Sequence, residues 1–534
     1  MGRVAGASGA GGGGGAADGE HVWSGLESAA RTARGAVGAV ALLQAVLAKK
    51  RDPLSHTLFL EEASAGSGAP VPAEQFWHVL CGTMAAKLNA VFHRASPVKE
   101  ELVMNYLKLG GLLERLMDGV EQDAVAGPLG VGASPRPAIP PGGREKMHRA
   151  AEVFQGAYLA RAFSHLNEAV SYTFGSRNVP NRAETRSLLA RLLEGLQPPE
   201  SGIPAHVALL LVVNVAKALK AVADRARAAA ASGPELRGLG RGCSQAQARN
   251  IALCLRLQEV HGTFQAVLAR VPPPGQEALQ GSLNLLERAA RRAVEPILRA
   301  AQEQLEASLQ RMAAERWDAP APADGTVSSA AFLPAFAASL GHFHEEFLVR
   351  LLQESDGETP QTSFVLAMVA DLAAGLAACF IRHAALLRPL GEAGTLRLAK
   401  TCAEFEAALR EGTLPAEQLG STSRTLRALR RLAVTPTAEL AGIAPVRELP
   451  VVDVLHHLYS RAPAEVRGPH ARAGLTLTQY TAWLDQHSEA EAVAGVETTL
   501  EGVGPEASGS EAVAAMRAII RGWEELGGRQ KRAE

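Results

Sequence analysis

Aromatic residues are scarce in this 534-residue sequence, where they make up only 4% of the chain. Apolar residues nevertheless reach 47%, so a core must be built mainly from Ala, Leu and Val. Ala and Leu favour helices, whereas the aromatic residues that favour strands are rare. Sustained alternation of apolar and polar residues, which is typical of strands, is absent as well. The composition therefore predicts an all-α protein.

Cysteine is also rare, and its five copies are scattered and form no Cys-x-x-Cys pair. The pattern supports neither a disulfide framework nor a structural zinc site, and we expect reduced thiols in a compartment that faces the cytosol. For nucleophilic catalysis, Cys254 and Cys379 would each need a positioned His, and the Gly-x-Ser-x-Gly elbow is missing. No enzyme signature remains, so we predict no catalytic, cofactor-binding or metal-binding residues and no cofactor.

Neither sign of charge dominates, because 54 Lys and Arg face 55 Asp and Glu, a formal net charge of -1. No global field therefore indicates nucleic acid as a partner. Two predicted helices carry local basic stripes. We interpret them mostly as solvated faces, although an acidic partner helix or lipid headgroups could bind them. The stripes consist of Arg288, Arg291 and Arg292, and of Arg424, Arg427, Arg430 and Arg431.

One apolar run, residues 364–381, approaches the length of a membrane span. It contains Asp371, and a central Asp costs at least ~2.5 kcal/mol on insertion scales. The run is rich in Ala and Gly, which suits close packing between helices. We predict a buried helix of a soluble bundle there. Residues 1–17 are mostly Gly and Ala without the charged region of a signal peptide, and we interpret them as a disordered leader.

Three clusters resemble binding motifs only superficially. His342 and His344 are two positions apart and point roughly opposite ways on a helix, unlike the i, i+4 pair of a metal helix. The adjacent His456 and His457 face apart for the same reason. The glycines between residues 238 and 242 follow no strand and lack the Lys-Ser/Thr of a phosphate loop. We predict a solvated helix face, a divergent pair and a plain loop.

Helix signals are clear at several positions. Ser96 can cap a helix that has Pro97 in its first position, and Thr476 has capping-box spacing to Gln479. Pro296 should kink or divide the long helix predicted over residues 276–317. The helix after Pro97 carries a one-sided apolar stripe, which indicates packing against a neighbouring helix. The stripe consists of Val98, Leu102, Tyr106, Leu109, Leu113 and Leu116.

Breaks rich in Pro and Gly divide the helical segments, and we predict an elongated stack of helical bundles in a rod. The predicted parts are a disordered leader (1–21), a first bundle (22–126), a linker or loop (127–144), a middle bundle (145–318), a break (319–328), a C-terminal bundle (329–486) and a weakly ordered tail (487–534) with one possible helix at 511–526.

The segment 380–409 combines an apolar helix, a turn and an amphipathic helix. We expect Thr395 to cap the second helix. Its inward face should be formed by Leu396, Ala399, Cys402, Phe405 and Leu409. Physical reasoning alone leaves the polar residues of the turn unexplained. The candidate site is this structural corner: Arg382, His383, Arg388, Pro389 and Gly391.

Seven segments resemble the fifth subunit of the conserved oligomeric Golgi complex, and they occur in that family's order. They read Val46-Leu-Ala-Lys-Lys-Arg-Asp-Pro53, Ala157-Tyr-Leu-Ala160, Gln245-Ala-Gln-Ala-Arg-Asn-Ile-Ala252, Glu295-Pro-Ile-Leu298, Phe380-Ile-Arg-His-Ala-Ala-Leu-Leu-Arg-Pro-Leu-Gly-Glu392, Ser460-Arg-Ala-Pro-Ala-Glu465 and Trp483-Leu-Asp-Gln-His487.

The resemblance implies a peripheral protein on the cytosolic face of the Golgi membrane, and in the cytosol. It implies a non-catalytic subunit of a vesicle-tethering complex that supports retrograde transport within the Golgi, enzyme retention and glycosylation. It also implies that the elongated stack of helical bundles is of the helical-rod tethering-complex type. The implied partners are other subunits, the seventh foremost, and Golgi SNAREs. A stand-alone helical adaptor outside the complex is the alternative. The corner residues are then expected to fasten the fold and not to act on a substrate.

The family carries a long N-terminal helical region before the segment at Val46, where this chain has its glycine-rich leader. We therefore expect a fragment, an alternative product or a mispredicted start, which bears on incorporation into the complex more than on the fold.

Overall fold

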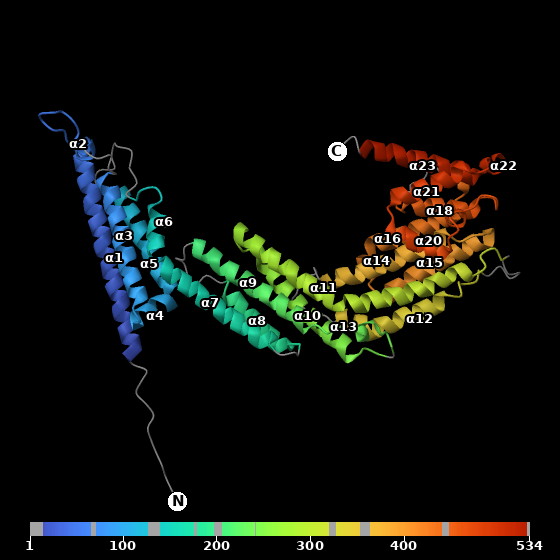
Figure 1. The fold of residues 1–534 in the computed structure, drawn as a ribbon, viewed down its shortest axis with the longest axis horizontal. Coiled ribbons are helices and arrows are strands. Elements are labelled where there is room, and N and C mark those ends of the chain that lie inside the picture. The colour runs from blue at the N-terminus through green and yellow to red at the C-terminus, as the bar shows by residue number, and fades with distance from the viewer. Residues whose placement is uncertain are drawn as a thin grey trace, which may run out of the picture. The chain divides into compact units, whose positions relative to one another are not determined.

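The computed structural model describes residues 14–65, 71–126, 139–175, 179–196, 205–240, 242–319, 327–352, 364–440 and 448–530. Their regular elements are helices, drawn as coiled ribbons in Figure 1. The β pairing within these ranges is a single isolated bridge between Arg51 and Leu58. The predicted all-α class is therefore confirmed. The chain forms two compact units, residues 1–225 with 267–285, and residues 226–266 with 286–534.

The first unit begins with a bundle in which α1 packs against α3 and α5, and α3 packs against α6. Its helices are α1 (Gly14–Leu47), α2 (Phe59–Ala65), α3 (Pro72–His93), α4 (Pro97–Met104), α5 (Tyr106–Ala126), α6 (Gly143–Ala150), α7 (Glu152–Phe174) and α8 (Arg182–Glu194). Helices α9 (Ala205–Ala229), α10 (Gln245–Leu268) and α11 (Pro273–Leu309) contribute residues to both units.

Trp77 is completely buried in the core of this bundle. Its indole nitrogen donates a hydrogen bond to the carbonyl oxygen of Gly143 over 3.1 Å, which ties α3 to the start of α6. A Cβ at Gly143 would lie 2.8 Å from that nitrogen and 2.7 Å from a methyl carbon of Ile139. Glycine is therefore required where α6 meets the Trp77 ring.

The second unit contains most of the shorter helices. They are η1 (Pro234–Arg237), η2 (Gln310–Ala314), α12 (Leu333–Phe343), the π-helix η3 (His344–Leu348), α13 (Val349–Leu352), α14 (Phe364–Ala385), α15 (Glu392–Gly412), α16 (Ala416–Val434), α17 (Thr437–Leu440), α18 (Val451–Arg461), α19 (Pro469–Arg472), α20 (Leu477–Gln486), α21 (Glu489–Glu501), α22 (Pro505–Ser508) and α23 (Glu511–Gln530).

Phenylalanine rings form the centre where α12, α14 and α15 meet. Phe380 stacks on Phe405 with ring centroids 4.1 Å apart, and Phe336 lies 5.1 Å from the same ring. All three side chains are fully buried. Three of the chain's aromatic residues therefore fill one helix crossing, and α14 continues from there to contacts with α16 and α18.

The predicted helix starts are confirmed at Ser96 and at Thr476. Ser96 accepts a hydrogen bond from the backbone nitrogen of Lys99, and Thr476 and Gln479 form a complete capping box. The helix after Pro97 is interrupted at Asn105, between α4 and α5. Helix α11 continues through Pro296, so this proline does not divide it.

Both predicted ends of the chain need correction. Helix α1 begins at Gly14, eight positions before residue 22, and residues 1–13 of the predicted leader lie outside the described residues. The tail beyond residue 487 contains α21 and α22 in addition to the predicted helix near 511–526, which is α23. Ser488 and Glu491 form a capping box that starts α21. The inner face of α21 is buried and contains Val493, Val496 and Leu500.

Two described helices are long and apolar enough to cross a membrane, α14 and the part of α9 from His206 to Ala229. In α14 the share of buried residues in the apolar window is 56%, and in α9 it is 50%. Asp371 of α14 is exposed and lies 3.6 Å from Arg291 of α11. Packing within the second unit therefore accounts for much of the apolar surface of α14.

Candidate functional site

Arg388 connects the corner between α14 and α15 to a distant loop of the second unit. Its guanidinium donates hydrogen bonds to the carbonyl oxygens of Ala462, at 3.3 Å, Pro463, at 2.6 Å, and Val466. Burial lowers the pKa of Arg388 from its ordinary high value, and the side chain stays a cation. A charged donor on three neutral carbonyls is a strong contact that fixes the loop after α18 against the corner.

Arg382 and His383 lie in the last turn of α14. Arg382 forms an ion pair with Asp485 of α20, and its side chain is 22% exposed. His383 is buried, and burial lowers its pKa to about 4, with the charge of Arg382 acting in the same direction. His383 is therefore neutral at physiological pH.

The turn itself contains the exposed Pro389, after a cis peptide bond, and Gly391. Gly391 is the N-cap of α15, and Thr395 donates its hydroxyl hydrogen bond back to the Gly391 carbonyl over 3.2 Å. The expectation that Thr395 caps the helix is therefore wrong, because α15 begins three residues earlier.

Gly394 is the position in this corner where the backbone demands glycine. A Cβ there would lie 1.8 Å from the carbonyl oxygen of Trp317, whereas the nearest atom to a Cβ at Gly391 is 3.8 Å away. The register of α15 also differs from the prediction at Leu396, which is 52% exposed. Leu398 takes its place in the core, because it lies four residues before Cys402 and so shares a helix face with Cys402, Phe405 and Leu409.

Helix α18 is buried along nearly its whole length although it contains an aspartate and two histidines. Burial raises the pKa of Asp453 to about 7 and lowers the pKa values of His456 and His457 to about 3. The His456 ring lies 3.0 Å from the Tyr480 hydroxyl, and His457 accepts a 3.1 Å hydrogen bond from Arg461. The two imidazoles therefore contact different neighbours, as the sequence predicts.

Arg461, at the end of α18, closes the C-terminus of α16. Its guanidinium donates to the carbonyl oxygens of Leu432 and Ala433, both at 2.8 Å, and to that of Thr435. The last carbonyls of a helix have no partner within the helix, so a cation placed there satisfies them and suits the helix dipole. Arg461 and Arg388 thus both use carbonyl groups to join elements far apart in the sequence.

The polar groups of this region are engaged within the second unit. The imidazoles of His383, His456 and His457 are neutral and enclosed, and the arginines are occupied by carbonyl groups or by Asp485. Such groups can orient helices. The corner residues thus contact other parts of the same unit in the described region.

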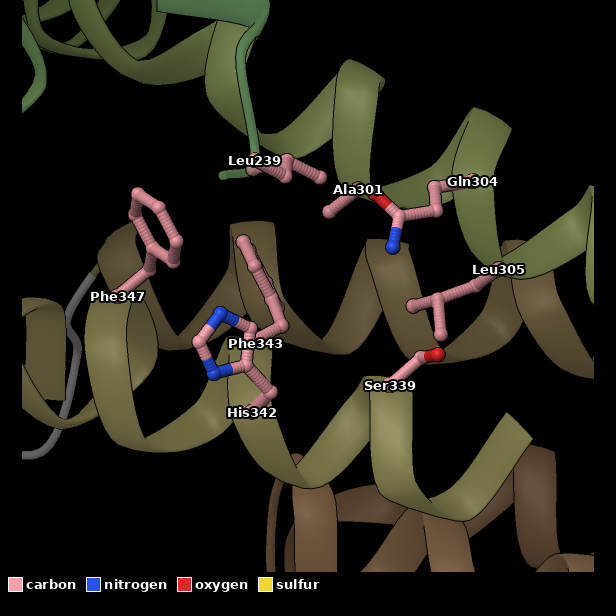
Figure 2. Close-up of a pocket in the computed structure, with 8 residues that line it drawn as sticks. All are labelled: Leu239, Ala301, Gln304, Leu305, Ser339, His342, Phe343 and Phe347. Carbon is pink, nitrogen blue, oxygen red and sulfur yellow. The ribbon is translucent and has the colours of Figure 1, made fainter. Parts of the chain in front are cut away.

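Side chains of the segment from His342 to Glu346 form hydrogen bonds to the backbone of the glycine loop after η1. His342 donates a 3.1 Å hydrogen bond to the carbonyl oxygen of Gly240, and Glu346 accepts one from the backbone nitrogen of Cys243. Gln247 donates to the carbonyl of Gly238 from the other side. Figure 2 shows Leu239 of this loop above a small hollow between α11 and the α12–η3 segment. The glycine loop is therefore pinned by side chains.

The two basic stripes are partly neutralised. Arg291 pairs with Glu287 at 2.8 Å in the first stripe. In the second, Arg427 pairs with Glu406 at 3.2 Å, and Arg431 pairs with Glu448.

The first unit presents an apolar surface that sequence reasoning did not single out. Residues 35–47 of α1 contain no charged side chain. One side of this stretch packs in the bundle, where Val37 is 2% exposed. The other side leaves Leu42 51%, Leu43 55% and Val46 38% exposed, and we call these three residues the α1 apolar face. A helix that is apolar all round is normally covered on every side, so this face is a candidate interface.

A second missed group is Arg397 of α15. It forms a largely buried ion pair with Glu315, and its guanidinium lies 4.6 Å from the centre of the Trp317 ring. Glu315 also accepts a 2.8 Å hydrogen bond from the backbone nitrogen of Phe332. Arg397 lies about 80 residues after Glu315 and Trp317, and no local sequence pattern indicates such a contact.

The family model for the C-terminal part of conserved oligomeric Golgi complex subunit 5 matches residues 13–117. Conserved oligomeric Golgi complex subunit 5 of Arabidopsis thaliana is 32% identical over 488 residues, which cover 90% of this chain and 57% of the relative. The chain resembles this Golgi subunit. The Mus musculus subunit 5 is 24% identical over 497 residues, 87% of this chain and 58% of that protein.

The chain thus spans somewhat more than half the length of these subunit 5 relatives. A solved structure, the SNARE Sec20 bound to Dsl1 complex subunit Tip20, aligns over 89% of this chain and 90% of that chain, with 13% identity and a TM-score of 0.28. At that score we draw no argument from it. The match to subunit 5 of two organisms runs through both units, including the corner and α18.

Proposed function

We propose that the chain is a non-catalytic subunit of a Golgi vesicle-tethering complex that supports retrograde transport within the Golgi, enzyme retention and glycosylation. The observation that carries the proposal is the match to the Arabidopsis subunit 5 over 90% of this chain. The corner and α18 agree with it, because their polar groups join helices and are enclosed. The chain would act on the cytosolic face of the Golgi membrane as a peripheral protein.

The α1 apolar face is our proposed contact with another subunit of the complex, and the seventh subunit is the first to test. It lies within the residues matched by the subunit 5 family model. Exposed aliphatic side chains on a helix without charges favour burial against an apolar helix of the partner. Golgi SNAREs are proposed as further partners, for which no particular surface of the chain is assigned.

Affinity purification of the tagged chain from cells, with quantification of the co-purified proteins, tests the proposal. We expect other subunits of the conserved oligomeric Golgi complex among the recovered proteins. Recovery of none of them would contradict the tethering role and favour a separate helical adaptor.

The double substitution Leu42→Lys and Leu43→Lys tests the face itself. It should lower subunit recovery about tenfold or more, because two charges would have to be buried in the contact. Leu396→Lys is the matched control, since Leu396 is equally exposed and lies in the second unit. Unchanged recovery with the double variant would exclude this face as the contact, while leaving the tethering role intact.

A further inference from the structure

An open groove lies between α12 and α15 within the second unit. Its volume is about 520 Å³. One end is marked by Ser329, whose hydroxyl donates to Glu404 over 2.9 Å, and the other by His344, whose ring is 3.2 Å from the Gly412 carbonyl. The groove is lined by Ser329, Leu333, Pro334, Ala337, Gly341, His344, Glu345, Glu404, Ala407, Ala408, Glu411 and Gly412.

Small side chains make the groove. Ala337 and Gly341 of α12 face Ala407 and Ala408 of α15, and all four are partly exposed. A Cβ at Gly341 would meet no other atom within 4 Å, so there is open space above it. The residues from Leu333 to Gly341 rise by about 12 Å, which is the length of about two helical turns. The floor is therefore apolar, and long enough to take two turns of another helix.

Acidic side chains border the groove. Glu345 extends from η3, and Glu404 and Glu411 extend from α15. The Lys400 ammonium lies 3.8 Å from Glu404, and it also donates to the carbonyl oxygen of Val327 over 2.7 Å. No lysine or arginine is among the lining residues. The groove thus combines an apolar floor with a negative border.

We propose that this groove binds an amphipathic helix of a partner protein whose apolar stripe is flanked by lysine or arginine. The stripe would pack on the alanines and Gly341, and the flanking cations would face Glu345 and Glu411, since Glu404 is engaged by Ser329 and Lys400. This is the arrangement in which a helix lies in an apolar groove and charge sets its choice of partner. The site is separate from the α1 apolar face and does not depend on membership of a Golgi complex.

Peptide binding to the full chain tests the charge requirement. The probe is a labelled synthetic helix of about 18 residues, with an Ala/Leu stripe flanked by lysines, and its match carries glutamates in their place. We expect the lysine peptide to bind at least about tenfold more tightly than the glutamate peptide. Its affinity should fall as salt is raised. Equal binding of the two peptides would overturn the proposal.

Groove variants locate the binding. Ala408→Leu should fill the floor and weaken the lysine peptide about tenfold, and Glu345→Gln with Glu411→Gln should weaken it by several-fold. Glu417→Gln, an exposed change on α16, should leave the affinity unchanged. Circular dichroism establishes that each variant keeps its helices. Unchanged affinity in all groove variants would overturn the proposal.

Sedimentation velocity distinguishes a partner helix from a second copy of this chain. We expect the unmodified chain and Ala408→Leu to have the same oligomeric state. A dimer that Ala408→Leu converts to a monomer would assign the groove to self-association and overturn the partner proposal.

Discussion

Arg388 donates hydrogen bonds to three carbonyl groups of a loop that follows it by more than 70 residues. A partly buried guanidinium has no substitute of equal reach and geometry, because it presents several donors in one plane. Arg382 and Arg397 act in a similar way through carboxylates, Asp485 and Glu315. Single arginines therefore join parts of the second unit that lie far apart in the sequence.

Replacing Arg388 by alanine should lower the free energy of unfolding by about 2–3 kcal/mol, because it leaves partly enclosed carbonyls without a donor. Thermal unfolding followed by circular dichroism measures the change. Arg424→Ala, an exposed change in α16, is the control and should leave the melting temperature unaltered. An unchanged melting temperature with lost subunit recovery would make Arg388 an interface residue instead.

Gly394→Ala should cost about 3 kcal/mol, because its Cβ would lie 1.8 Å from the Trp317 carbonyl oxygen and α15 would have to move. Gly495→Ala is the opposite case, since a Cβ there meets nothing within 4 Å. It should gain about 0.5–1 kcal/mol from the better helix former. Denaturant unfolding of both variants tests the pair, and equal effects would contradict the close approach at Gly394.

The sequence allowed the corner to be located and its polar residues to be chosen, because Pro, Gly and charge stand out against an apolar helix. It could not identify Gly394 or Arg397. Their roles depend on Trp317 and Glu315, which are about 80 positions away. Contacts between residues so far apart in the sequence produce no periodic pattern that could predict them. The role of the corner as a fastening remains a prediction until the variants above are measured.

At the level of the helix, α18 is the most unusual element, because its buried residues include one Asp and two His. Besides burial, nearby charged side chains shift the pKa values of these three residues and of His383. Those side chains are Arg382, Asp485, Glu489, Arg461 and His470. The pKa values of His383, His456 and His457 lie at about 4, 3 and 3, well below the ordinary 6.5. The pKa of Asp453 is shifted in the other direction, from the ordinary 3.8 up to about 7.

Acidification should therefore destabilise the second unit. Between pH 6.5 and pH 4 the unfolded chain protonates these histidines while the folded chain does not, so each costs about 2 kcal/mol at pH 5. Asp453 opposes this, because the folded state gains a proton below pH 7 and recovers about 3 kcal/mol at pH 5. The net loss is about 3 kcal/mol, and it should lower the melting temperature measured by calorimetry between pH 7.5 and pH 5.

His457→Gln should reduce this pH dependence by about 2 kcal/mol, because the amide can accept the Arg461 hydrogen bond without titrating. Leu396→Gln, an exposed change in α15 that alters no titratable group, is the control and should leave the pH dependence as it was. A melting temperature that stays constant from pH 7.5 to pH 5 would contradict the burial of these histidines in solution.

Local sequence patterns predict the helices in most of the chain. They also predict a helix boundary where a capping residue is present. Ser96 and Thr476 mark starts that the sequence alone reveals. The capping box of Ser488 and Glu491 marks the start of α21 in the same way. It stands among Glu, Ala and Gly, a composition that indicates weak order. The histidines of α18 hide its burial, because their partners must be known before they fit in a core. Those partners are Tyr480 of α20 for His456 and Arg461, at the end of α18 itself, for His457.

At the level of the whole molecule, the apolar helices α9 and α14 decide how the protein meets a membrane. About half of each apolar window is covered by other parts of the protein, and Asp371 of α14 is exposed. An ionised carboxylate in the middle of a span costs at least ~2.5 kcal/mol. Peripheral attachment is therefore the expected mode.

Alkaline carbonate should release the chain from Golgi membranes, because it strips proteins held by other proteins and leaves spanning helices in the bilayer. Immunoblotting of the supernatant and the pellet measures the release, with a known spanning Golgi protein as the pelleted control. Retention of this chain in the pellet would mean that α14 or α9 enters the bilayer.

During synthesis on the ribosome, the end of α16 emerges from the exit tunnel before Arg461 does, because Arg461 follows it in the chain. Its final turn then carries carbonyl groups whose donor arrives only 28 positions after Ala433. The end of α16 can settle only once α18 has emerged and packed, so the two helices must mature together. A nascent chain that stops before Arg461 would expose this unfinished helix end to the chaperones that screen new polypeptides.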